Sequence, residues 1–107
     1  LALENVDVLV TPTSPMVTPK LGEDLIDING KQVPMRPVLR RLTGPFNLSG
    51  LPACTIPCGF SADGLPIGLQ IIGKPFDEAT VLRVAHAYES HTNWHQQHPA
   101  VHAEALR

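Results

Sequence analysis

Two apolar stretches joined by a short polar turn constrain the fold of this chain more than any other feature. Thr55–Phe60 and Pro66–Ile72 are each short, apolar and bounded by turn residues, which is typical of strands. Ser61-Ala62-Asp63-Gly64 lies between them, and its Asp-Gly pair favours a turn that contains a left-handed residue. The sequence therefore predicts an antiparallel strand pair in the middle of the chain.

Two further strand units are predicted before this pair. Asp7–Val10 reads as a buried strand that the prolines of residues 11–15 bring to an end, and we expect it to have partners on both sides. Leu25–Ile28 and Lys31–Val33 are joined by Asn29-Gly30, two residues that tolerate positive φ. A surface hairpin is the prediction for this unit.

Helical spacing occurs twice. The apolar residues of 38–42 predict a short helix that stops before Gly44-Pro45. Glu78–Ser90 is the stronger helix prediction, because Asp77 stands at the N-cap and four apolar residues share one face. These four residues are Val81, Val84, Ala85 and Tyr88. Residues 93–99 lose the periodicity, and we expect Trp94 to anchor a packed or frayed tail.

Composition sets limits on size and partners. A chain of 107 residues with 43% apolar residues holds one domain at most. Its 8 basic and 10 acidic residues are interspersed and give a net charge of -2, so nucleic acid is not expected as a direct partner. No apolar run approaches the ~20 residues of a bilayer span, so no membrane partner is expected, and no secretory signal is visible.

The cysteines and histidines do not predict a metal site. Cys54 and Cys58 are four positions apart in a predicted strand, which separates their Cα atoms by ~13 Å, too far for a disulfide or a shared metal. We expect buried free thiols, as in a reducing compartment. Histidines recur at spacings of three to five residues, but Pro99 interrupts any helix and no His-Glu-x-x-His motif is present. A solvated tail is the preferred interpretation of His86, His91, His95, His98 and His102.

No catalytic nucleophile is predicted within the chain. None of the four serines lies in a Gly-x-Ser-x-Gly turn, and Ser49 is interpreted as a residue that satisfies the backbone at a helix end or turn. The lysines neighbour prolines or turn residues, where solvated charges are expected. Glycines inside a strand, such as Gly68 and Gly73, favour close backbone approach or a bulge.

Three ordered motifs carry a family resemblance. They are Asn47-Leu48-Ser49-Gly50-Leu51-Pro52-Ala53, Gly64-Leu65-Pro66-Ile67-Gly68-Leu69-Gln70 and Gly73-Lys74-Pro75-Phe76-Asp77-Glu78. With the strand and Thr-Pro loop of residues 7–15, they make the chain resemble the carboxy-terminal part of amidase signature enzymes. The resemblance implies an α/β fold, with a mixed β-sheet and flanking helices. It implies that residues 1–107 are the carboxy-terminal segment of a single amidase domain and are incomplete alone.

The resemblance also implies a chemistry. The full protein would hydrolyse carboxamide carbon–nitrogen bonds through a serine acyl-enzyme, with no metal or cofactor, and its catalytic residues would lie upstream of this chain. The chain alone is then expected to be inactive. Two alternatives remain: a fragment of the A subunit of glutamyl-tRNA(Gln) amidotransferase, and a non-catalytic binding or structural module.

Candidate substrate-binding residues follow from the same resemblance: Thr13, Arg40, Thr43 and Phe46. Amidotransferase subunits of this kind typically carry an acidic residue before the Pro-x-Asn motif, to hold the substrate amine. Arg40 and Arg41 occupy that neighbourhood here and would repel an ammonium group, so a general amidase is favoured. The alternative for both arginines is a solvated helix surface.

The expected partners are the remainder of the amidase domain and a small-molecule amide. A cytoplasmic location is expected. Because strand edges and an apolar face would be uncovered in the isolated chain, self-association as a homo-oligomer is also expected.

Overall fold

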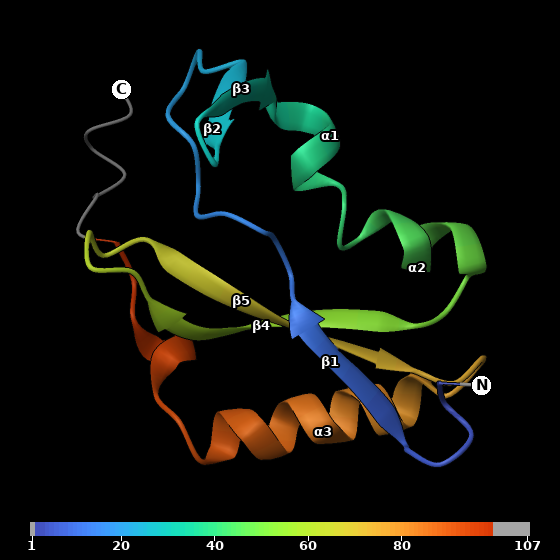
Figure 1. The fold of residues 1–107 in the computed structure, drawn as a ribbon. Helices are drawn as coiled ribbons and strands as arrows, with labels where there is room; N and C mark the ends of the chain where they lie inside the picture. Colours follow the sequence, from blue (N-terminus) through green and yellow to red (C-terminus); the bar gives the residue numbers. More distant parts are fainter. Residues whose placement is uncertain (1, 100–107) are drawn as a thin grey trace, which may run out of the picture.

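The computed structural model describes residues 2–99 of the 107 (Figure 1). The elements are, in chain order, β1 (Val8–Pro12), β2 (Leu25–Ile28), β3 (Lys31–Pro34), α1 (Met35–Leu39), α2 (Gly44–Ser49), β4 (Ala53–Phe60), β5 (Pro66–Gly73), α3 (Glu78–Ser90) and the 3-10 helix η1 (Trp94–Gln96). The predicted α/β class, with helices beside a sheet, is confirmed. No helix within residues 2–99 has the length and apolar character needed to cross a bilayer.

The main sheet has three strands in the order β1-β5-β4. β4 and β5 pair antiparallel, which confirms the central strand prediction, and Gly64 adopts a φ of 76° in the connection between them. The register shifts between Pro57 and Gly59, so the predicted irregularity in the glycine-containing strands occurs on β4. β1 also pairs antiparallel with β5, and every strand pair within the described residues is antiparallel.

β1 differs from its prediction. It pairs with β5 on one side only, and no second strand neighbours it within residues 2–99. Val10 is 59% exposed, so the strand is not buried throughout. The apolar residues of β1 instead reflect packing on one face of the strand. Val8 contacts the core that α3 covers, whereas Val10 is not part of that core.

α3 covers one face of the sheet and forms the core with it (Figure 1). The buried cluster consists of Ile56, Ile71, Val81 and Ala85, with Val84 and Tyr88 packed against it, so the predicted helical face is confirmed. Asp77 caps the helix, since its Oδ1 accepts a hydrogen bond from the Thr80 backbone nitrogen at 3.3 Å. Gly73 permits the close contact, because a Cβ there would lie 2.5 Å from Val81 Cγ2.

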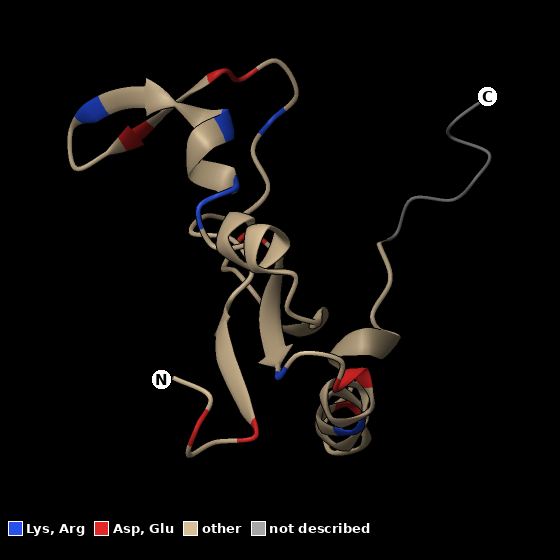
Figure 2. Ribbon diagram, turned by 90° about the vertical axis from the view of Figure 1, so that its right-hand side faces the viewer, with Lys and Arg blue, Asp and Glu red and all other residues tan. Residues whose placement is uncertain are grey.

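The β2–β3 hairpin is confirmed and lies at the end of the molecule away from α3 (Figures 1 and 2). Asn29 and Gly30 have φ values of 53° and 80°, the left-handed conformations that a two-residue turn of this kind requires. The Met35 backbone nitrogen donates to Asp24 O at 2.9 Å, which ties the end of the hairpin to the segment before it.

The segment between hairpin and sheet contains two short helices where one was predicted. α1 ends at Leu39, and Leu42 lies in the connection that follows, so the predicted helical extent was wrong. α2 begins at Gly44-Pro45, the pair before which the preceding helix was expected to stop. Proline fits the first turn because its missing N–H would have no intrahelical partner there. Gly50, with a φ of 68°, ends α2.

The structure also tests the predictions for the tail, the cysteines and the histidines. The Trp94 ring packs on Phe60 with a centroid separation of 6.1 Å, which confirms Trp94 as an anchor of the tail. Cys54 and Cys58 are free thiols, as expected, but both are half-buried rather than buried because β4 lies at an edge of the sheet. Residues 2–99 contain no cluster of three metal-ligating side chains, and His102 lies outside the described residues.

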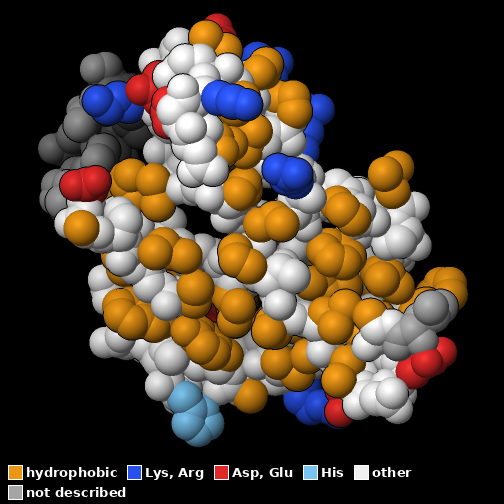
Figure 3. All heavy atoms as spheres, viewed as in Figure 1, with side chains coloured by type: hydrophobic (Ala, Val, Ile, Leu, Met, Phe, Trp, Pro, Cys, Tyr) orange, Lys and Arg blue, Asp and Glu red, His pale blue; other side chains and the backbone are white. Residues whose placement is uncertain are grey.

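Charge is distributed unevenly between the sheet and its surroundings. The strands β1, β4 and β5 contain no charged residue. Lys, Arg, Asp and Glu lie on the hairpin, on α1, on the connections and on α3 (Figure 2). In the face viewed in Figure 3, apolar side chains extend across the middle of the molecule. The sheet is therefore an uncharged scaffold between two charged ends.

Candidate functional site

The two faces of the β1-β5-β4 sheet carry different side chains. Residues paired across neighbouring strands lie on the same face, and alternate residues of a strand point to opposite faces. Ile56 and Ile71 therefore contribute to the face covered by α3. Thr11, Gln70 and Thr55 are paired in register and lie on the opposite face. The same face also carries the apolar Leu9, Ile72 and Ala53. It has no charged side chain, and we call it the polar face after its three hydrogen-bonding residues, Thr11, Gln70 and Thr55.

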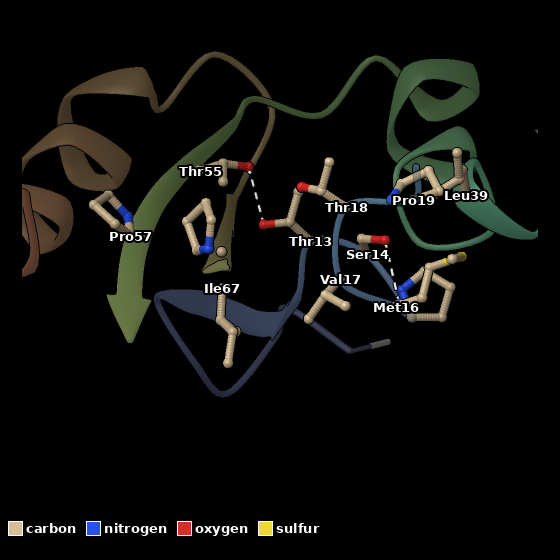
Figure 4. A pocket seen from close by; sticks show the side chains of 13 residues that line it. Thr13, Ser14, Met16, Val17, Thr18, Pro19, Leu39, Thr55, Pro57 and Ile67 are labelled. Carbon is tan, nitrogen blue, oxygen red and sulfur yellow. Dashed lines mark hydrogen bonds between the residues drawn. The ribbon is translucent and has the colours of Figure 1, made fainter. Parts of the chain in front are cut away.

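A pocket of about 610 Å³ is built on this polar face, where β1 ends (Figure 4). It is lined by Thr13, Ser14, Pro15, Met16, Val17, Thr18, Pro19, Leu39, Thr55, Pro57, Pro66, Ile67 and Gly68. The loop after β1 supplies more than half of this lining, and Pro15 and Pro19 restrict its backbone. No lining side chain carries a charge.

Two threonine hydroxyls meet within the pocket (Figure 4). Thr13 Oγ1 donates to Thr55 Oγ1 at 3.2 Å, and the Thr13 backbone nitrogen donates to Gly68 O at 3.0 Å. A Cβ on Gly68 would lie 2.7 Å from Thr13 Oγ1 and 3.0 Å from Thr55 Cγ2. Because Gly68 has no side chain, the Thr13 and Thr55 hydroxyls are able to pack directly against β5.

A buried amide lies behind the pocket. Gln70 is only 3% exposed, and its Nε2 donates to Thr11 Oγ1 at 2.9 Å and to Leu42 O at 3.0 Å. A buried amide without such partners would destabilise the fold. These two bonds connect β1, β5 and the α1–α2 connection, three segments that are distant in sequence.

The four residues predicted to bind substrate occupy different places. Thr13 lines the pocket. Arg40, Thr43 and Phe46 are not among its lining residues, although Leu39, the neighbour of Arg40, is. Arg40 and Arg41 are exposed between α1 and α2, Thr43 O accepts from the Asn47 nitrogen, and Phe46 is half-buried in α2.

The serines have structural partners. Ser49 Oγ donates to Phe46 O at 3.3 Å and Ser90 Oγ donates to His86 O at 2.8 Å. The hydroxyls of Ser14 and Ser61 accept hydrogen bonds from backbone nitrogens two and four residues later. Each of the four therefore satisfies backbone groups, as interpreted for Ser49 from the sequence.

Sequence reasoning missed the roles of Thr55 and Gln70. Only Gln70 offered a clear signal, since a polar residue within an otherwise apolar strand requires a hydrogen-bond partner when it is buried, whereas Thr55 is exposed. Gln70 interrupts the apolar residues of β5, and Thr55 stands opposite it in register. The partners themselves, Thr11 and Leu42, follow only from the tertiary structure.

A sequence model of the amidase family matches residues 1–82 of the chain. The chain is 50% identical over 99 residues to the A subunit of glutamyl-tRNA(Gln) amidotransferase from Thermodesulfovibrio yellowstonii, covering 92% of this chain and 19% of that protein. Several other organisms have subunits of the same name with similar identity.

Solved structures agree with this assignment. A crystal structure of an amidase superposes with a TM-score of 0.77 and 31% identity, over 84% of this chain and 20% of the other. 6-aminohexanoate cyclic dimer hydrolase superposes with a TM-score of 0.76 and 36% identity, over 88% of this chain and 21% of the other. This chain thus spans about a fifth of the length of the proteins that it matches.

Proposed function

This chain belongs to the amidase family, and from that membership we propose that the protein containing it hydrolyses the carbon–nitrogen bond of uncharged carboxamides. Residues 1–107 would form the carboxy-terminal segment of a single amidase domain. The observation that carries the proposal is the uncharged pocket of about 610 Å³, built by segments that lie within the family match.

The reaction would proceed through a serine acyl-enzyme. A serine outside residues 1–107 would attack the amide carbonyl and pass its proton through a base to the leaving nitrogen, releasing ammonia or an amine. Water would then hydrolyse the ester to a carboxylic acid and regenerate the serine. The structural partners of Ser14, Ser49, Ser61 and Ser90 support a nucleophile located elsewhere in the protein.

The pocket would hold the substrate through contacts suited to a neutral molecule. Its walls are apolar side chains and hydroxyls, and burying a charge there without a partner would be costly. The contact between the Thr13 and Thr55 hydroxyls uses only one of their two O–H protons, so the other remains free to donate to a carbonyl oxygen. The proposed role of Thr13 in binding rests on this geometry, while Arg40, Thr43 and Phe46 remain candidates for the rim of the site.

Two regions of the chain are uncovered, and we expect the remainder of the amidase domain to cover both. One edge of β1 has no strand partner within residues 2–99. Beside β1, a hollow of about 300 Å³ is lined by residues that include the apolar Val10 and Ile67. Unpaired edges and apolar patches of this kind favour association, so the isolated chain would form homo-oligomers. The free thiols of Cys54 and Cys58 support a cytoplasmic location.

Ammonia release tests the proposal. The gene product containing this chain, purified without other subunits, is expected to release ammonia from uncharged aliphatic and aromatic carboxamides. A variant lacking the upstream serine serves as the control. Inability to hydrolyse any uncharged amide would overturn the proposal.

A second candidate is the A subunit of a glutamyl-tRNA(Gln) amidotransferase, favoured by relatives that are 50% identical and carry that name. Arg40 and Arg41 weigh against it, because both are exposed in the neighbourhood where the resemblance implies an acidic residue that would hold the glutamine amine. Glutamine hydrolysis that requires partner subunits, without hydrolysis of simple amides, would establish this second function instead.

A further inference from the structure

We propose that Gln70 is a positioning residue that fixes the distance between two walls of the pocket. The inference rests on the proposed function, because it assigns a role in substrate binding to a side chain that does not line the pocket itself. Gln70 would act through its two hydrogen bonds, one to each wall segment.

The first bond reaches the loop wall. Thr11 Oγ1 accepts from Gln70 Nε2 at 2.9 Å, and Thr13, two residues later, begins the loop that lines the pocket. Thr13 is held in turn by its backbone bond to Gly68 O and by its hydroxyl bond to Thr55. The start of this wall is thus tied to β5 at Gln70 and again at Gly68.

The second bond reaches the segment that supplies Leu39 to the lining. Leu42 O accepts from Gln70 Nε2 at 3.0 Å, and Leu39, three residues earlier at the end of α1, lines the pocket. α1 has five residues and α2 has six, and neither contains a buried residue. Such short helices are marginal by themselves, so a bond from the buried sheet is well placed to define where this segment lies.

Gln70 is suited to this role by its burial and chemistry. A side chain that is 3% exposed has little freedom to reorient. One amide nitrogen carries two hydrogens, so it bonds both walls at once and couples their positions. A hydroxyl or an aliphatic side chain at this position lacks the two donors.

The test substitutes Gln70→Met, which preserves length and removes both donors. In the gene product, KM for an uncharged carboxamide is expected to rise about tenfold while kcat changes less than about twofold. Hydrogen exchange should accelerate in peptides from residues 35–50 and stay unchanged in peptides from α3. Faster exchange throughout the sheet and α3, or unchanged exchange in residues 35–50, would overturn the proposal.

A second pair of variants covers the case in which Gln70→Met fails to fold. Thr11→Val removes the acceptor on β1 alone, and Thr11→Ser keeps a hydroxyl there. Thr11→Val is expected to raise KM about threefold, and Thr11→Ser to restore it. Equal KM values for both variants would contradict the proposal. If the unmodified protein hydrolyses no amide, the proposed function fails, and exchange in residues 35–50 still decides the positioning role.

Discussion

The two faces of the β1-β5-β4 sheet use the same strands for different purposes. On one face, Ile56 and Ile71 pack against α3, and Gly73 lets the helix approach β5 closely. On the other face, Gly68 lets two threonine hydroxyls approach the same strand, and a pocket remains open beside them. Each face thus places a glycine of β5 at its closest contact. The difference indicates that the α3 face stabilises the fold, while the polar face is available for binding.

The largest effect is expected on the α3 face. Ile71→Ala removes a side chain that is 1% exposed and should lower the free energy of unfolding by about 3 kcal/mol. Urea denaturation of the gene product measures this change. Leu82→Ala is the control on the exposed side of α3 and should cost less than about 0.5 kcal/mol. Similar costs for both would show that α3 does not form the core.

Gly73→Ala comes next in magnitude. The new Cβ would lie 2.5 Å from Val81 Cγ2 and 3.3 Å from Asp77 O, which should destabilise the protein by about 2 kcal/mol. In a Val81→Ala background the same substitution should cost at least about 1 kcal/mol less, because the clashing methyl is gone. A double-mutant cycle of urea denaturation midpoints provides the measurement. Additive costs would contradict the contact.

Gly68→Ala makes the matching change on the polar face. Its Cβ would lie 2.7 Å from Thr13 Oγ1, 3.0 Å from Thr55 Cγ2 and 3.1 Å from Thr13 Cβ. These atoms belong to side chains beside an open pocket, where they have room to shift, so the stability cost should be about 1 kcal/mol, less than for Gly73→Ala. Displacing Thr13 should nevertheless raise KM for an uncharged amide about tenfold. Gly44→Ala has no heavy atom within 4 Å of the new Cβ and is the control. A stability loss as large as that of Gly73→Ala would remove the distinction between the faces.

Thr55→Val isolates the hydroxyl pair. Thr55 is exposed, so the free energy of unfolding should change by less than about 0.5 kcal/mol. Loss of its donor should raise KM about threefold, as measured by steady-state ammonia release. An unchanged KM would place the substrate carbonyl away from Thr55.

Arg40→Glu should have the smallest effect. Arg40 is exposed and does not line the pocket, so KM for uncharged amides should change less than about twofold. Binding of an amide that carries an ammonium group should improve, because a repulsive charge is replaced by an attractive one. Isothermal titration with a charged and an uncharged amide separates the two effects. A large loss for uncharged amides would place Arg40 in the binding site.

Much of the fold was predictable because local chemistry determines it. Asn29-Gly30 specifies its hairpin turn through positive φ, and Asp77 specifies the start of α3 through its cap. The second short helix was missed because Gly44-Pro45 is compatible both with ending a helix and with beginning one.

The candidate site was harder to predict from the sequence than the fold. Thr13 was selected through a family resemblance, but its neighbours Thr55 and Gly68 depend on strand register. The bond from Gln70 to Leu42 O spans 28 residues and involves a backbone atom that every residue type provides. No local pattern specifies such a partner, which explains why the connection between the walls emerged only from the tertiary structure.

Ligand-dependent hydrogen exchange tests the assignment of the two faces most directly. The gene product is compared with and without a saturating, slowly hydrolysed uncharged carboxamide. We expect protection in peptides that cover residues 13–19 and 53–57, and no change in peptides from α3. Protection confined to α3, or bound ligand without protection of residues 13–19, would contradict the assignment of the polar face as the binding surface.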